Sequence, residues 1–214
     1  IDAPMVVEDA LECVYGILSG LHAAHEEGIV HRDIKPSNIV FDHHNNPCIT
    51  AFGVALLTHP HKAKRLFYET DIIAGTPDYM SPEQMTPNLG DVSTKSDIYS
   101  CGLLLYEMLT EKKCHNFGKI TSGYQLMRMA GCLPPPEQFP FPNCIPTSVV
   151  LFTQRLLRHD PEERPNAEEA MAEIDAIKIA AIGDSPVPSE KALASRTIEH
   201  EGRANSHHQL DKAV

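Results

Sequence analysis

The stretch that decides the fold is His31-Arg32-Asp33-Ile34-Lys35-Pro36-Ser37-Asn38. It follows a run with helical periodicity and precedes a short apolar run, so we expect a tight loop between a helix and a strand. An aspartate such as Asp33 can accept a hydroxyl proton, Lys35 can contact a phosphate, and the Asn38 amide can offer an oxygen to magnesium. Each of these residues alone would be an ordinary solvated turn residue. Their order within one loop makes it the candidate site.

The segments on either side of this loop predict one helix and one hairpin. Over residues 8–25 the large apolar residues recur at steps of three and four, which is one face of an amphipathic helix. They are Leu11, Val14, Leu18 and Leu21. Gly28 fits a helix stop. After the loop, the apolar residues 39–41, a polar turn and residues 48–50 predict two paired strands.

Three later segments predict further helices. Residues 97–109 are apolar on nearly every side, and a helix of that kind must be buried. Burial stabilises by about 1.5–3 kcal/mol for each large side chain, so we expect this helix to be the pillar of the core. Residues 149–157 and 167–181 predict two more helices. Asn166 is placed to cap the second of them, whose first turn is acidic.

The rest of the chain reads as connections and a tail. Residues 53–96, which prolines interrupt, are predicted to be mostly loop, and residues 131–147 form a proline-rich connection. From Gly183 onward the sequence is polar and has no sustained period, which predicts disorder. We therefore expect a mainly α fold with one small hairpin, comprising a folded part over 1–182 and a tail over 183–214.

Composition narrows the classes of partner. The length of 214 residues fits one ordinary domain, or one lobe of a larger domain with a tail. The chain has 18 basic and 29 acidic residues, a net charge of −11, so its surface should repel nucleic-acid phosphates and anionic membranes. We expect no nucleic-acid partner. The longest apolar run, residues 98–109, is too short to cross a bilayer, so we expect no membrane span.

Cysteines and histidines are numerous but not arranged as ligands. The six cysteines have no C-x-x-C pair and no regular spacing, which favours reduced thiols and a cytoplasmic location. The twelve histidines form no H-x-x-x-H or Cys/His framework. We therefore expect no dedicated histidine metal site.

The loop matches the catalytic-loop pattern H-R-D-x-K-P-x-N of protein kinases, which is highly specific. Four further segments follow in the order in which that family carries its motifs. They are Ala51-Phe52-Gly53 at D-F-G, residues 75–83 at the segment ending in A-P-E, residues 96–102 at D-x-W-x-x-G with Tyr99 for tryptophan, and residues 160–165 at the late arginine. The sequence therefore resembles the Hanks-type Ser/Thr protein kinases over about residues 8–180. The resemblance implies their helical C-terminal lobe.

The resemblance assigns roles to the residues around the loop. Asp33 would be the catalytic base, Lys35 would steady the transferred phosphoryl group, and Thr76 would tie the substrate-binding loop to both. Asn38 would hold a magnesium ion, and Val40 would form the floor of the adenine pocket. ATP and Mg²⁺ are thus the implied cofactors, with a protein substrate as partner.

Other matching positions would be architectural or regulatory. The architectural set comprises His31, Phe52, Gly53, Glu83, Asp97 and Arg164. Within it, Glu83 and Arg164 would form a buried ion pair, and Asp97 would brace the catalytic-loop backbone. Arg32 beside the base implies control by phosphorylation of the activation loop, with Thr70 as the first acceptor and Tyr68 as the second.

Two departures from the family pattern bear on activity. Ala51 stands where the family carries its magnesium-binding aspartate, and alanine has no ligand oxygen. Metal stabilisation of the transferring group is worth several kcal/mol, so we expect transfer to slow by orders of magnitude. The second departure is that no Gly-rich loop, lysine of V-A-I-K or partner glutamate precedes residue 8. We expect the β-rich N-terminal lobe, normally present in the same chain, to be absent here.

Two functions from different classes remain open. One is a Ser/Thr protein kinase whose phosphoryl transfer is lost or severely impaired in this form. The other is a pseudokinase that acts as a scaffold or allosteric partner. Retention of Asp33, Lys35 and Asn38 favours the first, and Ala51 favours the second. An unrelated helical interaction module would require five ordered motifs to coincide by chance.

Overall fold

The structure is a computed structural model that describes residues 4–52, 56–57, 76–118, 120 and 122–183. The chain divides into two units, residues 1–178 and 179–214, and only the last residues of one helix are described in the second. The first unit is mainly helical with two small sheets, which confirms the predicted fold class. The tail from residue 184 onward lies outside the described residues.

The predicted helices and the predicted hairpin appear in the expected order, together with elements that were not predicted. The α-helices are α1 (Val7–Glu26), α3 (Pro82–Met85), α4 (Thr94–Thr110), α5 (Gly123–Ala130), α6 (Thr147–Leu156) and α7 (Ala167–Gly183). The strands are β1 (Ile29–Val30), β2 (Ile39–Phe41), β3 (Pro47–Ile49) and β4 (Leu56–Leu57). Single 3-10 turns are η1 (Pro36–Asn38), η3 (Pro77–Tyr79), η4 (Pro87–Leu89), η5 (Pro136–Gln138) and η6 (Pro161–Glu163).

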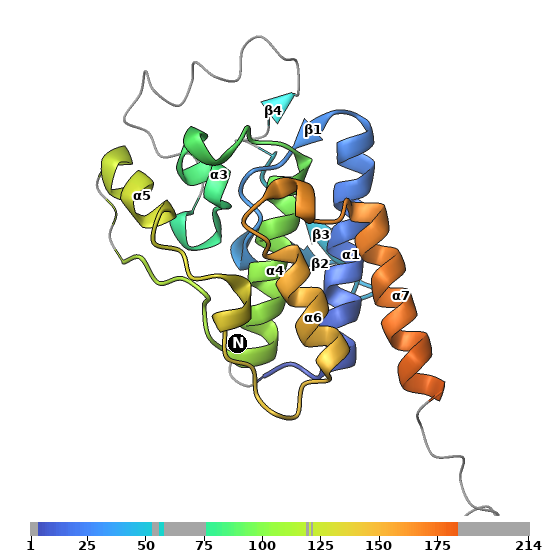
Figure 1. Cartoon of the computed structure of the whole chain (residues 1–214). Coiled ribbons are helices and arrows are strands. Elements are labelled where there is room, and N and C mark those ends of the chain that lie inside the picture. The colour runs from blue at the N-terminus through green and yellow to red at the C-terminus, as the bar shows by residue number, and fades with distance from the viewer. Residues whose placement is uncertain (1–3, 53–55, 58–75, 119, 121, 184–214) are drawn as a thin grey trace, which may run out of the picture. The chain divides into compact units, whose positions relative to one another are not determined.

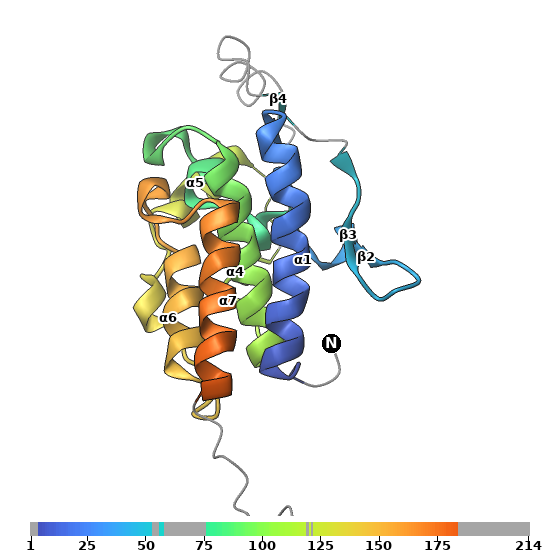
Figure 2. The same ribbon diagram turned by 90° about the vertical axis from the view of Figure 1, so that its right-hand side faces the viewer.

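The centre of the first unit is α4, with α1 packed on one side and α6 on another (Figures 1 and 2). Fourteen of the seventeen residues of α4 are buried, so the prediction of a buried pillar is confirmed. The predicted face of α1 is buried as well, and it joins the same core cluster as α6 and the start of α7. Gly28 ends the first helical segment with a φ of 69°, a conformation that glycine adopts without a Cβ clash.

Two close approaches depend on glycines. A Cβ on Gly102 of α4 would lie 2.9 Å from the Cβ of Leu156, so glycine allows α6 to pack closely here. A Cβ on Gly16 of α1 would lie 2.5 Å from Cγ of Pro47, so glycine likewise allows the β2–β3 hairpin to pack against α1. Figure 2 shows that hairpin beside α1.

The two small sheets have different origins in the sequence. The predicted hairpin is confirmed as β2 and β3, which pair antiparallel with Ile39 opposite Ile49. The second sheet pairs β1 with β4, Ile29 opposite Leu57, and was not predicted. Each of its strands has only two residues, too few to show a period in sequence.

Several helical turns appear where the sequence predicted loop. The segment 76–89 contains η3, α3 and η4, each opening with a proline at its first position, where the missing N–H costs no hydrogen bond. The eight-residue helix α5 was also not predicted, and Ser122 caps it by accepting from the Gln125 N–H. The predicted cap of α7 is present, with Asn166 Oδ1 accepting from the Glu169 N–H at 2.8 Å.

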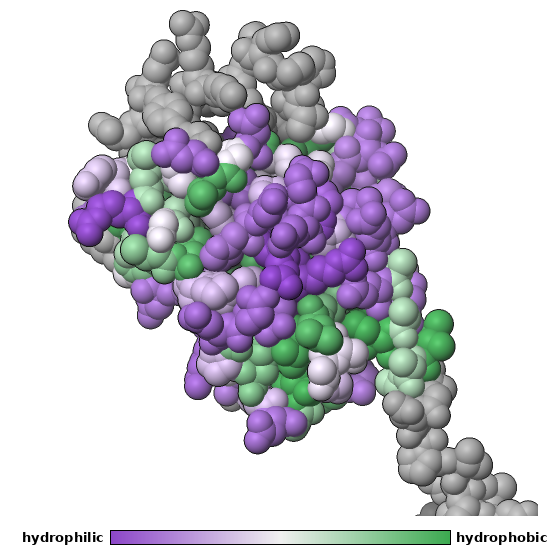
Figure 3. Space-filling view, viewed as in Figure 1, coloured by the Kyte–Doolittle hydropathy of each residue, from purple (hydrophilic) through white to green (hydrophobic). Residues whose placement is uncertain are grey.

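The surface of the face shown in Figure 1 is mostly polar (Figure 3). An apolar area lies over α6, where the Leu151 side chain is 60% exposed. None of the described helices combines the length and the apolar character that a membrane-spanning helix needs.

Candidate active site

The carboxylate of Asp97, in the first turn of α4, fixes the catalytic-loop backbone. Asp97 is fully buried and accepts hydrogen bonds from the backbone N–H groups of His31 at 2.9 Å and Arg32 at 2.8 Å. The ring Nε2 of His25, at the end of α1, lies 2.9 Å from the same carboxylate. Arg32 has a φ of 71°, a conformation that costs free energy for a non-glycine residue. The hydrogen bonds from the His31 and Arg32 N–H groups to Asp97 hold the backbone in this conformation.

Three polar side chains meet at the carboxylate of Asp33. Lys35 Nζ lies 2.7 Å from Oδ2, and Asn38 Nδ2 donates to the same oxygen at 3.0 Å. The Thr76 hydroxyl donates to Oδ1 at 3.2 Å and accepts from Lys35 Nζ at 2.7 Å. The structure therefore brings together three residues of the predicted loop and one from a segment about 40 residues later. Among the described residues, Asp33 Oδ1 accepts this one hydrogen bond from Thr76, so it keeps a lone pair for a substrate proton.

The side chain of Arg32 points into the protein rather than into bulk water. Arg32 is 8% exposed, and its backbone carbonyl accepts a hydrogen bond from Gln84 Nε2 at 2.8 Å. Burial lowers the pKa of this guanidinium, while the nearby charge of Asp97 acts in the opposite direction. The proposed phosphorylation sites Thr70 and Tyr68 lie outside the described residues.

The segment that would carry the second magnesium ligand has an unusual backbone. Ala51 is exposed and has a φ of 63°, in the left-handed region that aspartate, asparagine and glycine favour over alanine. The next residue, Phe52, packs edge-on against the His31 ring at 4.7 Å and stays 44% exposed. The His31 ring in turn lies 2.9 Å from the Thr50 carbonyl. Gly53 lies outside the described residues.

These residues do not fit a magnesium site of the usual kinase kind. Magnesium prefers carboxylate oxygens together with substrate phosphates. The Asn38 Nδ2 donates hydrogen bonds to Asp33, so only the uncharged Oδ1 of Asn38 is left as a possible metal ligand. The Ala51 side chain has no oxygen. In the described part of the chain, no group of three His, Cys, Asp or Glu side chains could hold a metal ion. The predicted adenine contact Val40 lies on β2 and is 47% exposed.

Glu83 and Arg164 form a buried ion pair. The two guanidinium nitrogens lie 2.7 and 2.9 Å from the two carboxylate oxygens, and both side chains are fully buried. Ser96 adds a hydrogen bond to Glu83 at 2.7 Å, and Tyr99 places its ring 4.8 Å from the guanidinium carbon. Burial alone would raise the pKa of Glu83, but the bonds and charge of Arg164 hold it below its ordinary value.

Sequence reasoning missed several contacts that surround the site. Tyr79 donates to Glu107 of α4 at 2.6 Å, and burial with this contact raises its pKa above the ordinary range. Asp78 pairs with Lys113 at 2.8 Å. His25, which contacts the carboxylate of Asp97, was counted only as a helix residue. Each contact joins residues 28 to 72 positions apart, so no local pattern could have revealed it.

The chain matches the family model described as "Protein kinase domain" over residues 3–174. It is similar to the serine/threonine-protein kinase PknB of Mycobacterium leprae, with 32% identity over 194 residues. It is also similar to the serine/threonine-protein kinase pkn2 of Myxococcus xanthus, with 30% identity over 178 residues. It is similar as well to the serine/threonine-protein kinase PrkC of Bacillus subtilis, with 38% identity over 109 residues.

The matches cover 90% of this chain for PknB, 79% for pkn2 and 51% for PrkC. They cover only 29% of PknB, 20% of pkn2 and 16% of PrkC. The chain thus corresponds to less than a third of the length of each relative. The family match nevertheless spans most of the chain, and it includes the loop, the buried ion pair and the helix that braces the loop. The chain therefore belongs to the protein kinase family, as a Hanks-type Ser/Thr kinase.

Proposed function

We propose that this chain forms the substrate-side lobe of a Ser/Thr kinase fold and that Ala51 severely impairs its phosphoryl transfer. The observation that carries the proposal is the contrast at the site. The Asp33, Lys35 and Thr76 cluster is assembled with hydrogen-bond geometry, while the neighbouring ligand position carries a methyl group. Asp33 would accept the proton of a protein hydroxyl, and Lys35 would contact the phosphoryl group.

The size of the impairment follows from the missing ligand. Metal ions supply several kcal/mol of charge stabilisation in phosphoryl transfer, and each 1.4 kcal/mol corresponds to about a tenfold change in rate. Loss of the main protein anchor should therefore slow transfer by orders of magnitude. ATP and Mg²⁺ serve the family, and for this chain we propose that their binding is weakened.

A second candidate function is a pseudokinase that acts as a scaffold or allosteric partner for another protein. Ala51 favours it, because the fold and the loop geometry are maintained without the metal ligand. In either case we propose a protein partner and a cytoplasmic location. The location is supported by the six cysteines, all of which lie in the described part and carry free thiols.

The test is labelled-phosphate transfer from ATP by the intact gene product, with a generic basic protein as acceptor. The wild type is compared with Ala51→Asp and with Ala51→Gly. Glycine accepts the left-handed backbone but supplies no oxygen, so it is the matched control for the ligand itself. Asp33→Asn in the Ala51→Asp background shows whether any signal depends on the base.

We expect transfer only from Ala51→Asp, with loss of the signal when Asp33 is also changed. Silence from both the wild type and Ala51→Asp would refute the kinase proposal and leave the scaffold as the better explanation. Transfer by the wild type at a rate similar to that of Ala51→Asp would show that the metal argument is wrong.

A further inference from the structure

A buried histidine lies in the middle of the segment that follows α4. His115 is 4% exposed, and its ring Nε2 lies 3.1 Å from the hydroxyl of Tyr99. Tyr99 is fully buried in α4, at the position where the kinase pattern carries tryptophan. A buried tyrosine hydroxyl needs a hydrogen-bond partner, because the desolvated group is costly to leave unpaired. In this chain His115 supplies that partner.

The contact between His115 and Tyr99 is a neutral one. Burial lowers the pKa of His115 to about 4, with a smaller contribution from the nearby His159, so its ring carries no charge at pH 7. Burial also raises the pKa of Tyr99 above its ordinary value, so its hydroxyl stays protonated. Phe117 stacks on the His115 ring with 5.3 Å between the ring centroids. The bond therefore links the segment to α4 without placing a charge in the core.

The residues on either side of His115 hold the turn η3. Lys113 Nζ pairs with the carboxylate of Asp78 at 2.8 Å, and the Phe117 N–H donates to the same carboxylate at 3.1 Å. Asp78 is the middle residue of η3. His115 thus lies between two residues that both contact Asp78, and it is the one of the three whose side chain bonds to α4.

The turn η3 in its turn sets the position of Thr76. Thr76 directly precedes η3, and its carbonyl accepts a hydrogen bond from the Tyr79 N–H at 2.9 Å. The Thr76 hydroxyl bonds to Asp33 and Lys35 of the catalytic loop. One end of η3 is tied to α4 directly, because Tyr79 donates to Glu107. Its middle is tied through Asp78 to the segment that contains the buried histidine.

We propose that His115 is a positioning residue that anchors the 113–117 segment to Tyr99 of α4. The anchored segment holds Asp78, and through Asp78 it holds Thr76 at the catalytic loop. His115 acts through these residues and not by contact with a reacting group. The anchoring does not depend on catalysis, whereas its consequence for phosphoryl transfer rests on the proposed function.

The first test is hydrogen exchange at single amides, followed by NMR in the full chain. His115→Phe and Tyr99→Phe each remove one partner of the hydrogen bond and keep most of the side-chain volume. Tyr106→Phe is the matched control, because Tyr106 is also a buried tyrosine of α4 whose hydroxyl bonds to another segment, at the Pro140 carbonyl. Circular dichroism verifies that each variant folds.

The amides that report on the anchor are those of Phe117 and Tyr79, which donate to Asp78 and Thr76. We expect both to exchange about tenfold faster in His115→Phe and in Tyr99→Phe. The double variant should exchange no faster than His115→Phe alone, because both changes remove the same bond. Unchanged exchange in His115→Phe would overturn the proposal. So would an equal acceleration in Tyr106→Phe, because these amides would then report only on global stability.

The second test measures phosphate transfer in the Ala51→Asp background. There His115→Phe should lower kcat about tenfold and leave the KM for ATP within about twofold, because a displaced Thr76 disturbs the catalytic loop and not nucleotide binding. His115→Gln, whose amide can still bond to Tyr99, should recover most of this loss. An unchanged kcat in His115→Phe would overturn the positioning role. Silence of Ala51→Asp itself would refute the proposed function instead, and the exchange experiment would then decide this proposal alone.

Discussion

Two regions where the family pattern places charged groups differ in this molecule: the Glu83–Arg164 pair retains both charges, and position 51 has lost its charge. At the Glu83–Arg164 pair, both charges are buried, bidentate and supported by further hydrogen bonds. At Ala51, which is exposed and follows β3, the charge expected for the family is absent. Removing one charge from a buried pair strands the other in a low-dielectric interior, which is costly. Removing an exposed carboxylate strands nothing. The fold can therefore lose a metal ligand far more easily than an architectural charge.

The largest expected effect is at the buried pair. Arg164→Met keeps much of the side-chain volume but leaves Glu83 buried and unpaired, which should lower the free energy of unfolding by about 3–5 kcal/mol. Urea denaturation followed by circular dichroism measures it. Arg155→Ala, which breaks the exposed pair with Glu173, should cost at most about 1 kcal/mol. Equal losses from the two variants would contradict the contrast between buried and exposed charge.

Acid should weaken the same pair without any mutation. The pKa of Glu83 is lower in the folded protein than in the unfolded chain, so the unfolded chain binds its proton first as the pH falls. The stabilisation from this group is fully present above the unfolded pKa and is lost as pH falls through the folded pKa. Unfolding measured between pH 7 and pH 3 should show this loss. Glu83→Gln should remove this component of the acid dependence.

Loss of the Asp97 carboxylate, which holds the catalytic-loop backbone, should have an effect of similar size. Asp97→Ala leaves the buried N–H groups of His31 and Arg32 without their acceptor, at about 1–3 kcal/mol for each unsatisfied group. Thermal unfolding measures the loss, and hydrogen exchange at these two amides should increase. Unchanged exchange at both amides would show that Asp97 does not hold the loop.

Close packing of α6 on α4 gives a smaller effect. Gly102→Ala places a methyl group 2.9 Å from the Leu156 Cβ, which cannot move without its backbone, so we expect a loss of about 1–3 kcal/mol. Gly123→Ala in α5 is the matched control, because nothing lies within 4 Å of its added Cβ. Chemical denaturation compares the two. A loss from Gly123→Ala as large as that from Gly102→Ala would point to backbone propensity and not to packing.

The smallest expected effect is at Ala51. Ala51→Gly should stabilise the fold by no more than about 1 kcal/mol, because relief of the left-handed strain is partly offset by the freedom that glycine gains in the unfolded chain. Differential scanning calorimetry can detect the change. A loss of several kcal/mol would mean that the Ala51 methyl group makes packing contacts that hold the fold, contrary to the comparison above.

Long elements with a clear period were predictable, and short or nonlocal ones were not. The sequence pattern placed α1, α4, α6 and α7 within a few residues, because each buries a continuous face or the whole helix. It missed the β1–β4 pair and α5. The β1–β4 strands have two residues each, and α5 buries only Leu126 and Ala130. Their stability comes from tertiary contacts that the local pattern does not encode.

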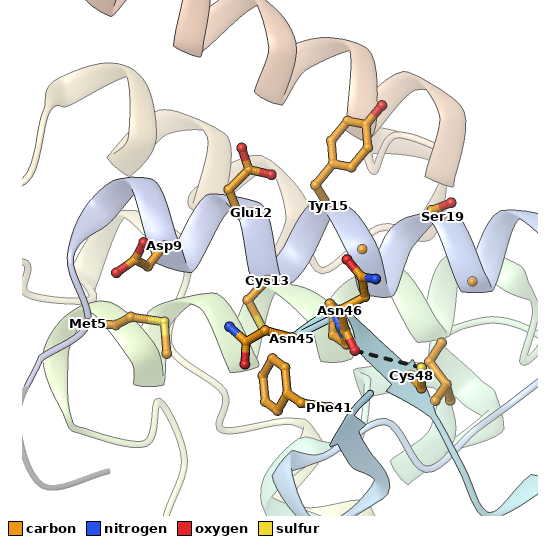
Figure 4. A pocket seen from close by; sticks show the side chains of 14 residues that line it. Met5, Asp9, Glu12, Cys13, Tyr15, Ser19, Phe41, Asn45, Asn46 and Cys48 are labelled. Carbon is orange, nitrogen blue, oxygen red and sulfur yellow. Dashed lines mark hydrogen bonds between the residues drawn. The ribbon is translucent and has the colours of Figure 1, made fainter. Parts of the chain in front are cut away.

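By itself, the sequence determined the mainly α fold, its buried pillar and the identity of the loop residues, because periodicity and ordered motifs are local properties. Only the tertiary structure decided which atoms meet. It brought Thr76 to Asp33 and Lys35, and it turned the Asp97 carboxylate onto two loop amides. It also left Phe41 of β2 53% exposed, although the same hairpin packs against α1 (Figure 4). These contacts depend on how the helices and loops pack across many residues, and a spacing along the chain does not fix a distance in space.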